Sequence, residues 1–139
     1  MKRLLLDTCA VIDLLVASGD LEKSVKDVFD DPEYTHCASF GTMRELVVHF
    51  NNKKLLSKYW KTADDVIRTV ENDLEIEFLP LRPQVGHTYA NLRLNTGQDH
   101  RDPSDHIIIA HAITDHMPLL SSDTRFWYYR DQGLELIEY

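Results

Sequence analysis

Short apolar segments alternate along the chain with longer segments of helical character. A short apolar run bounded by turn-forming residues is typical of a strand buried in a sheet. The alternation of acidic and apolar residues in 75–78 is instead typical of an edge strand. We therefore expect strands at residues 3–6, 34–38, 75–79, 119–121 and 134–137.

The segments between these strands carry apolar residues at three- and four-residue spacing or begin with capping residues. Ser39 is a candidate N-cap, and Asp102 stands before a proline at a first helical position. We expect helices at residues 10–16, 21–29, 39–50, 57–72, 82–95 and 102–116. This alternation predicts a three-layer α/β fold with a mainly parallel central β-sheet flanked by helices, in a single domain of residues 1–139.

The composition is that of a globular protein. Of the 139 residues, 43% are hydrophobic and 27% are charged, which argues against disorder. No apolar run is long enough to cross a bilayer, and Asp7 ends the first apolar stretch too early for a signal peptide. Cys9 and Cys37 form neither a disulfide framework nor a zinc motif. We expect a cytoplasmic protein with reduced thiols and no membrane contact.

The net charge of −8 argues against a nucleic-acid partner held by bulk electrostatics, because phosphate binders usually present a basic surface. Acids that hold a metal ion nevertheless present a positive centre to phosphate. The charge by itself therefore leaves the partner open.

Acidic residues fall where parallel strands are expected to end. Asp7 directly follows the first predicted strand and Asp123 follows the fourth, so both reach one rim of a parallel sheet. Glu45 lies about two turns into the helix after the second strand. Asp102 and Asp105 open the helix before the fourth strand, and their i, i+3 spacing puts them on one face.

Each of these acids also has an ordinary structural interpretation. A residue such as Asp7 or Asp123 at a strand end can form a turn, and Glu45 can be a solvated helix acid. Asp102 is better explained as an N-cap, and Asp105 could favour the helix dipole. Taken singly, none of the acids establishes a function.

Convergence of several carboxylates would itself demand a cation. Without one they repel one another, so at least one must raise its pKa or find a partner. Mg²⁺ or Mn²⁺ resolves this conflict, because hard cations prefer oxygen ligands and keep waters for substrate phosphate. Such a site can activate a water molecule and neutralise charge on phosphoryl oxygens. No serine, cysteine or histidine constellation competes with it.

Four segments resemble the motifs of PIN-domain nucleases, in the family's order and spacing and over nearly the whole chain. The bacterial VapC-type toxins are the nearest members. The third and fourth segments are the more specific, because an acid-led helix with Ala-x-Ala precedes a strand closed by a Ser/Thr-x-Asp-x-x-Phe turn. The segments are 4–12 (LLLDTCAVI), 45–46 (EL), 102–112 (DPSDHIIIAHA) and 120–126 (LSSDTRF).

The resemblance implies a PIN-like fold and an endoribonuclease that uses Mg²⁺ or Mn²⁺ to hydrolyse RNA phosphodiester bonds. It also implies a cognate antitoxin protein that wraps the enzyme, and a homodimer. The family's acidic quartet maps onto Asp7, Glu45, Asp105 and Asp123. Accessory positions are Thr8, Asp102 and Ser121.

The resemblance also assigns roles to the quartet. Asp7 and Asp105 are the principal metal ligands. Glu45 and Asp123 complete the metal's shell, directly or through waters, and orient the attacking water. In-line attack would leave a 5′-phosphate and a 3′-hydroxyl.

Two positions depart from the family pattern. His106 and Ser122 stand where many members of this subgroup have arginine. The role that those arginines play in substrate contact therefore cannot be carried over to this chain. Metal binding is expected to depend on the acids instead.

Lys54, Lys58 and Lys61 recur at i, i+4 and i+7 around Tyr59 and Trp60. The interpretation we favour is a solvated helix face, with an aromatic side chain packed inward or at a dimer contact. A basic stripe that approaches RNA is the alternative.

Seven histidines raise the question of zinc. The spacing of His100, His106, His111 and His116 matches no common ligand pattern. For His111, which lies between two alanines of a predicted helix, we expect packing or a surface position rather than ligation.

Three other functions stay open at this level. The chain could be a PIN nuclease of RNA processing without a toxin role, or a PIN-like module that binds RNA or protein without cutting. All four acids are retained, which argues against the second. The third is a phosphotransferase with Asp7 as nucleophile, but the second acid that such enzymes typically carry two residues later is absent.

Overall fold

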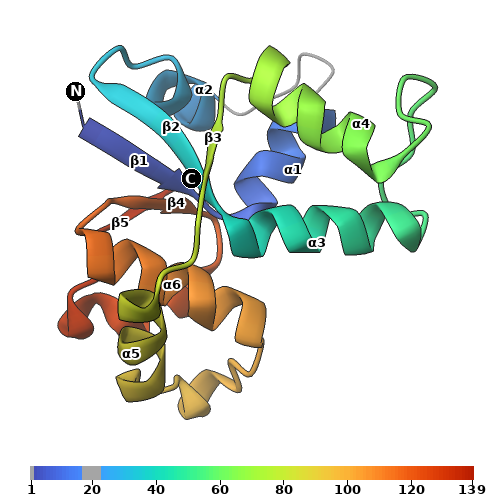
Figure 1. Ribbon diagram of the computed structural model, residues 1–139. Coiled ribbons are helices and arrows are strands. Elements are labelled where there is room, and N and C mark those ends of the chain that lie inside the picture. Colours follow the sequence, from blue (N-terminus) through green and yellow to red (C-terminus); the bar gives the residue numbers. More distant parts are fainter. Residues whose placement is uncertain (1, 17–22) are drawn as a thin grey trace.

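A five-stranded parallel sheet forms the centre of the computed structural model, which describes residues 2–16 and 23–139 (Figure 1). The strand order is β3-β2-β1-β4-β5, and all four neighbouring pairs are parallel. The chain adds strands on one side of β1 and then on the other, which creates a topological switch point at β1. The strands are β1 (Lys2–Leu6), β2 (Tyr34–Ser39), β3 (Glu77–Leu79), β4 (Leu119–Ser121) and β5 (Leu136–Glu138).

Neighbouring residues of β1 belong to two different cores. Leu4 and Leu6 pack in one apolar cluster, whereas Leu5 packs in a second cluster on the opposite face of the sheet. Because both faces are covered at the centre of the sheet, β1 ends in three consecutive leucines and β4 begins with two. The predicted three-layer α/β fold with a parallel sheet is confirmed.

Two groups of helices cover the two faces (Figure 1). The first group comprises α1 (Thr8–Val16), α2 (Lys23–Phe29), α3 (Phe40–Asn51), α4 (Ala63–Arg68) and the π-helical turn η1 (Thr69–Asp73). The second comprises α5 (Pro83–Asn91), the short 3₁₀ helix η2 (Thr96–Gln98), α6 (Pro103–Asp115) and the 3₁₀ helix η3 (Thr124–Gln132). Within the described ranges no helix is both long and apolar enough to cross a membrane.

Capping and packing move several predicted boundaries. The helix expected from residue 57 begins only after Thr62, because Thr62 and Asp65 form a capping box at that point. The helix expected over 82–95 ends at Asn91, and Leu92 is already extended. Of the helix expected over 21–29, the structure describes Lys23–Phe29 as α2, and residues 21 and 22 lie outside the described part. The aromatic segment of η3 was not predicted as a helix.

The lysines of the predicted basic stripe do not lie on a helix. Lys54, Lys58 and Lys61 fall in the irregular segment between α3 and α4, so the predicted helix face is wrong. Trp60 packs against the core and donates from Nε1 to Oγ1 of Thr69 at 3.1 Å. The indole anchors this segment and leaves its lysines on the surface.

Candidate metal centre

Asp7 stands where β1 ends, directly beside the end of β4. Its backbone N–H donates to the carbonyl oxygen of Leu120 at 3.0 Å, which joins the two strand ends. Its side chain is 2% exposed and accepts two hydrogen bonds, from the N–H of Thr8 at 2.8 Å and from Oγ of Ser121 at 2.9 Å. Thr8 and Ser121, two of the three predicted accessory residues, therefore both orient this carboxylate.

Glu45 projects from α3 toward the same region. Its Oε1 accepts a hydrogen bond from Oγ1 of Thr8 at 2.8 Å, and Oγ1 of Thr8 is 3.0 Å from Oγ1 of Thr42. Since the Thr8 hydroxyl donates to Glu45, it must accept from Thr42. Thr8 thus links Asp7, through its backbone, to Glu45, through its side chain.

Asp105 lies in the first turn of α6, and it raises the pKa of Asp7. The Asp7 carboxyl has its pKa raised from 3.8 to about 7, by burial and then by the charge of Asp105. Burial followed by the charges of Asp102, Glu45 and Asp123 likewise raises the pKa of Asp105 to about 7. The predicted quartet therefore shares one electrostatic environment, and its role in catalysis stays a prediction.

Asp123 closes β4 and is neutralised by a neighbour. It caps η3 by accepting the N–H of Arg125 at 2.9 Å. The Arg125 guanidinium also donates to both of its oxygens, at 3.1 Å from Nε and 2.7 Å from Nη2, and holds the pKa of Asp123 below its usual value. The same Nη2 lies 4.0 Å from Oδ2 of Asp105. Arg125 was not among the predicted site residues.

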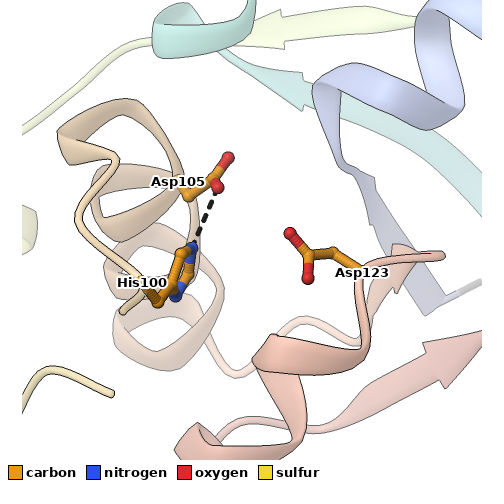
Figure 2. Close-up of side chains that lie close together, drawn as sticks. All are labelled: His100, Asp105 and Asp123. Atoms are coloured by element: carbon orange, nitrogen blue, oxygen red, sulfur yellow. Dashed lines mark hydrogen bonds and ion pairs between the residues drawn. The ribbon is translucent and has the colours of Figure 1, made fainter. Parts of the chain in front are cut away.

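His100 is a second residue that the sequence did not indicate. Its buried ring contacts Oδ2 of Asp105 through Nε2 at 2.9 Å, and Figure 2 shows Asp123 facing this pair from the other side. One ligand atom from each of His100, Asp105 and Asp123 lies within 4.8 Å of the others. Burial lowers the pKa of His100 below its usual value.

The acids at the switch point and the order of the elements agree with the motifs noted in the sequence. The sequence matches the PIN domain family over residues 4–131. The chain belongs to the PIN domain family. Among curated proteins, none matches this PIN domain in sequence.

Solved structures with the same fold include toxin–antitoxin complexes. One chain of VapBC2 from Rickettsia felis, bound to a DNA fragment from the promoter, gives a TM-score of 0.74 at 17% identity over 98% of both chains. VapBC-1 from nontypeable Haemophilus influenzae gives 0.70 at 20% identity, over 98% of this chain and 97% of that one. FitAcB from Neisseria gonorrhoeae gives 0.68 at 19%, over 97% and 96%. At these identities the likeness concerns the fold.

The donor set of the PIN domain fits a hard divalent cation. Four carboxylates approach one another, and two of them have a pKa near 7, which is the situation that a bound cation relieves. Oxygen donors favour Mg²⁺ or Mn²⁺ over softer metals. Within the described residues no hydrogen bond reaches Oδ1 of Asp105, so this oxygen is available to an ion.

Asp102 acts as a helix cap in the PIN domain. It is exposed and accepts the N–H of Ser104 at 2.9 Å, as expected for the N-cap of α6. We expect Asp102→Ala to lower the free energy of unfolding by about 1 kcal/mol. Asp102→Asn should keep the cap and weaken Mg²⁺ binding by less than about threefold, since the lost charge lies outside the predicted ligand set. Urea unfolding and calorimetric titration measure both, and a tenfold loss in Asp102→Asn would make Asp102 a ligand.

Arg125 already holds the carboxylate that Asp123 would offer to the predicted metal ion. We expect Arg125→Gln to tighten Mg²⁺ binding by about three- to tenfold, because a resident positive charge is removed from the site. Arg101→Gln is the matched control: it removes the same charge from an exposed arginine that pairs with Asp99. Calorimetric titration with Mg²⁺ compares the two variants, and equal affinities would contradict the prediction.

Two further histidines, His111 and His106, are buried and have structural roles. His111 is fully buried and contacts Oγ of Ser39 through Nδ1 at 3.0 Å, so it packs, as expected. His106, at a position where arginine is common in the subgroup, is buried and contacts the carbonyl oxygen of His100 through Nε2 at 3.0 Å. Its side chain supports the loop before α6 and is turned away from solvent.

Proposed function

We propose that this PIN domain is an endoribonuclease that uses Mg²⁺ or Mn²⁺, and that it is the toxin of a toxin–antitoxin pair. The observation that carries the nuclease proposal is the approach of Asp7 and Asp105, each with a pKa near 7, at the switch point of a parallel sheet. The toxin proposal is supported by the fold shared with chains of VapBC and FitAcB structures.

Asp7 and Asp105 would hold the ion, with Glu45 and Asp123 completing its surroundings. A bound ion supplies charge stabilisation at the phosphoryl oxygens and lowers the pKa of a bound water. Thr8 and Ser121 hold the Asp7 carboxylate in a fixed orientation, so its position costs little reorganisation during the reaction.

Glu45 is suited to accept a proton from the attacking water. Oε1 is engaged by Thr8, which leaves Oε2 to take the proton, and burial raises the pKa of this carboxyl above its usual value. The water oxygen then forms the new bond to phosphorus while the bond to the 3′ oxygen breaks. The leaving oxygen takes up a proton, and the products carry a 5′-phosphate and a 3′-hydroxyl.

Cleavage of mixed cellular RNA with mapping of the new ends tests the nuclease proposal. We expect cleavage in Mg²⁺ or Mn²⁺ that stops with a chelator, and products with the ends named above. Asp105→Asn serves as the inactive comparison. Cleavage that is indifferent to the chelator, or equal in the variant, would exclude this chemistry.

Growth on expression separates a toxin from a nuclease of RNA processing. We expect arrest that is relieved when the neighbouring gene for a small DNA-binding antitoxin is expressed with it. Absence of arrest by an enzyme that is active in vitro would favour the processing role. A homodimer is a further expectation of the same resemblance, and sedimentation analysis measures it. A cytoplasmic location stays the expectation drawn from the sequence itself.

A further inference from the structure

A buried series of polar contacts leads from Asp105 into the core of the protein. Nε2 of His100 lies 2.9 Å from Oδ2 of Asp105, and Nδ1 of the same ring lies 3.0 Å from the hydroxyl of Tyr129. The side chain of His100 and the whole of Tyr129 are shielded from solvent. Figure 2 shows the imidazole below Asp105, joined to the carboxylate by a dashed line.

The direction of each hydrogen bond follows from the donors present. The hydroxyl of Tyr129 accepts the backbone N–H of Asn95 at 3.1 Å, so this contact leaves the hydroxyl proton free to be donated. Within the described residues, Nδ1 of His100 is the hydrogen-bond acceptor to which the Tyr129 hydroxyl can donate this proton. Nδ1 therefore carries no proton, and the proton of the neutral ring lies on Nε2, which faces Asp105.

The ring of His100 is fixed on several sides. The backbone carbonyl of His100 is in contact with Nε2 of His106 at 3.0 Å, and its imidazole packs against the rings of Phe126 and Tyr129. Asn95 anchors the far end of the series, because its Nδ2 donates to the carbonyl oxygen of Arg125 at 3.0 Å. The series thus connects Asp105 on α6 with the loop before α6 and with η3.

We propose that His100 is a positioning residue of the metal centre and not a metal ligand: it donates from Nε2 to Oδ2 of Asp105 and directs Oδ1 toward the ion. A ligating imidazole needs an unprotonated nitrogen, and Nε2 is the nitrogen that faces the acids. Metal-binding residues are commonly oriented by such outer contacts, whose loss typically weakens metal binding by about 10- to 100-fold. The inference rests on the proposed metal site.

Tyr129 offers a variant that disturbs the series without touching an acid. Tyr129→Phe removes the hydroxyl that fixes the ring and keeps the buried aromatic volume. Tyr128→Phe is the matched control, since the adjacent Tyr128 is half exposed and its hydroxyl forms no hydrogen bond with the described residues. Calorimetric titration with Mg²⁺ should show binding about tenfold weaker in Tyr129→Phe and unchanged in Tyr128→Phe.

Nitrogen-15 NMR of the His100 ring tests the proposal in the parent protein. We expect the Nε2-protonated tautomer without metal and again at saturating Mg²⁺. Loss of the Nε2 proton on Mg²⁺ addition, or the Nδ1-protonated tautomer in the metal-free protein, would overturn the proposal. So would equal Mg²⁺ affinity in the two tyrosine variants. If the parent bound no Mg²⁺, the proposed function would fail, whereas the tautomer would still decide whether His100 donates to Asp105.

Discussion

Asp7→Asn should abolish most RNA cleavage and at the same time make the metal-free protein more stable at pH 8. In the proposed site Asp7 is a principal metal ligand, so its loss would remove charge stabilisation at the transition state, and we expect the rate to fall by at least about 100- to 1000-fold. Cleavage of a fixed RNA substrate at saturating Mg²⁺ measures this loss. An undiminished rate would show that Asp7 is not a ligand.

The gain in stability has a separate cause. Burial and the charge of Asp105 raise the pKa of Asp7 from 3.8 to about 7, so keeping this carboxylate ionised at pH 8 costs up to about 4 kcal/mol. Asparagine can still accept the N–H of Thr8 but carries no charge. We expect denaturant unfolding with a chelator to show a higher free energy of unfolding, by about 1 to 4 kcal/mol.

Asp131→Asn is the control for this pair of effects, because Asp131 is exposed and the substitution removes the same charge. It should leave both cleavage and stability unchanged. A stability gain of equal size in the control would show that general charge repulsion, at a net charge of −8, is responsible.

Mg²⁺ should bind far more tightly at pH 8 than at pH 5.5. The pKa values of Asp7 and Asp105 are both raised to about 7, so at pH 5.5 a proton must leave before the ion can bind. One such proton weakens binding by about 30-fold between these two pH values, and a second adds to the loss. Calorimetric titrations at the two pH values measure the ratio. An affinity independent of pH would mean that neither carboxyl lies at the ion.

Without metal, the contribution of these carboxyls to the free energy of unfolding should fall as the pH rises, whereas the Mg²⁺ affinity rises. The folded protein binds protons at Asp7 and Asp105 between about pH 4 and 7, where the unfolded chain has released them. The contribution of these two groups therefore destabilises the fold progressively as the pH rises through this range. Saturating Mg²⁺ should abolish that decline, and thermal unfolding with and without the ion compares the two cases.

The sheet could be predicted from the sequence because a buried strand shows itself as a short run of apolar residues. Leu4 and Leu6 pack in one core and Leu5 packs in the other, so all three positions must be apolar. This run of apolar residues can be seen in the sequence without a structure. Helix boundaries depend on single caps instead. The Thr62 capping box sets the start of α4, and the apolar spacing of residues 57–72 does not reveal it.

The acids were predictable, but two of their partners, His100 and Arg125, were not. Asp7 and Asp123 stand at strand ends, a position that the chain order alone fixes. His100 reaches Asp105 only because a loop folds back onto α6, and Arg125 reaches Asp105 only because η3 follows β4 closely. The spacing of the two residues in each contact matches no recognisable sequence motif, so the structure was needed to find both contacts.

The hydrogen bond from Asp7 to Leu120 joins strands whose residues lie more than a hundred positions apart in the chain. No fragment that lacks either strand could assemble the carboxylates, so the proposed metal site exists only in the folded protein. An ion that binds only the folded protein lowers the population of unfolded molecules in proportion to its own occupancy. The supply of divalent cations would then influence how many copies are exposed to proteases, and thus how long the protein persists.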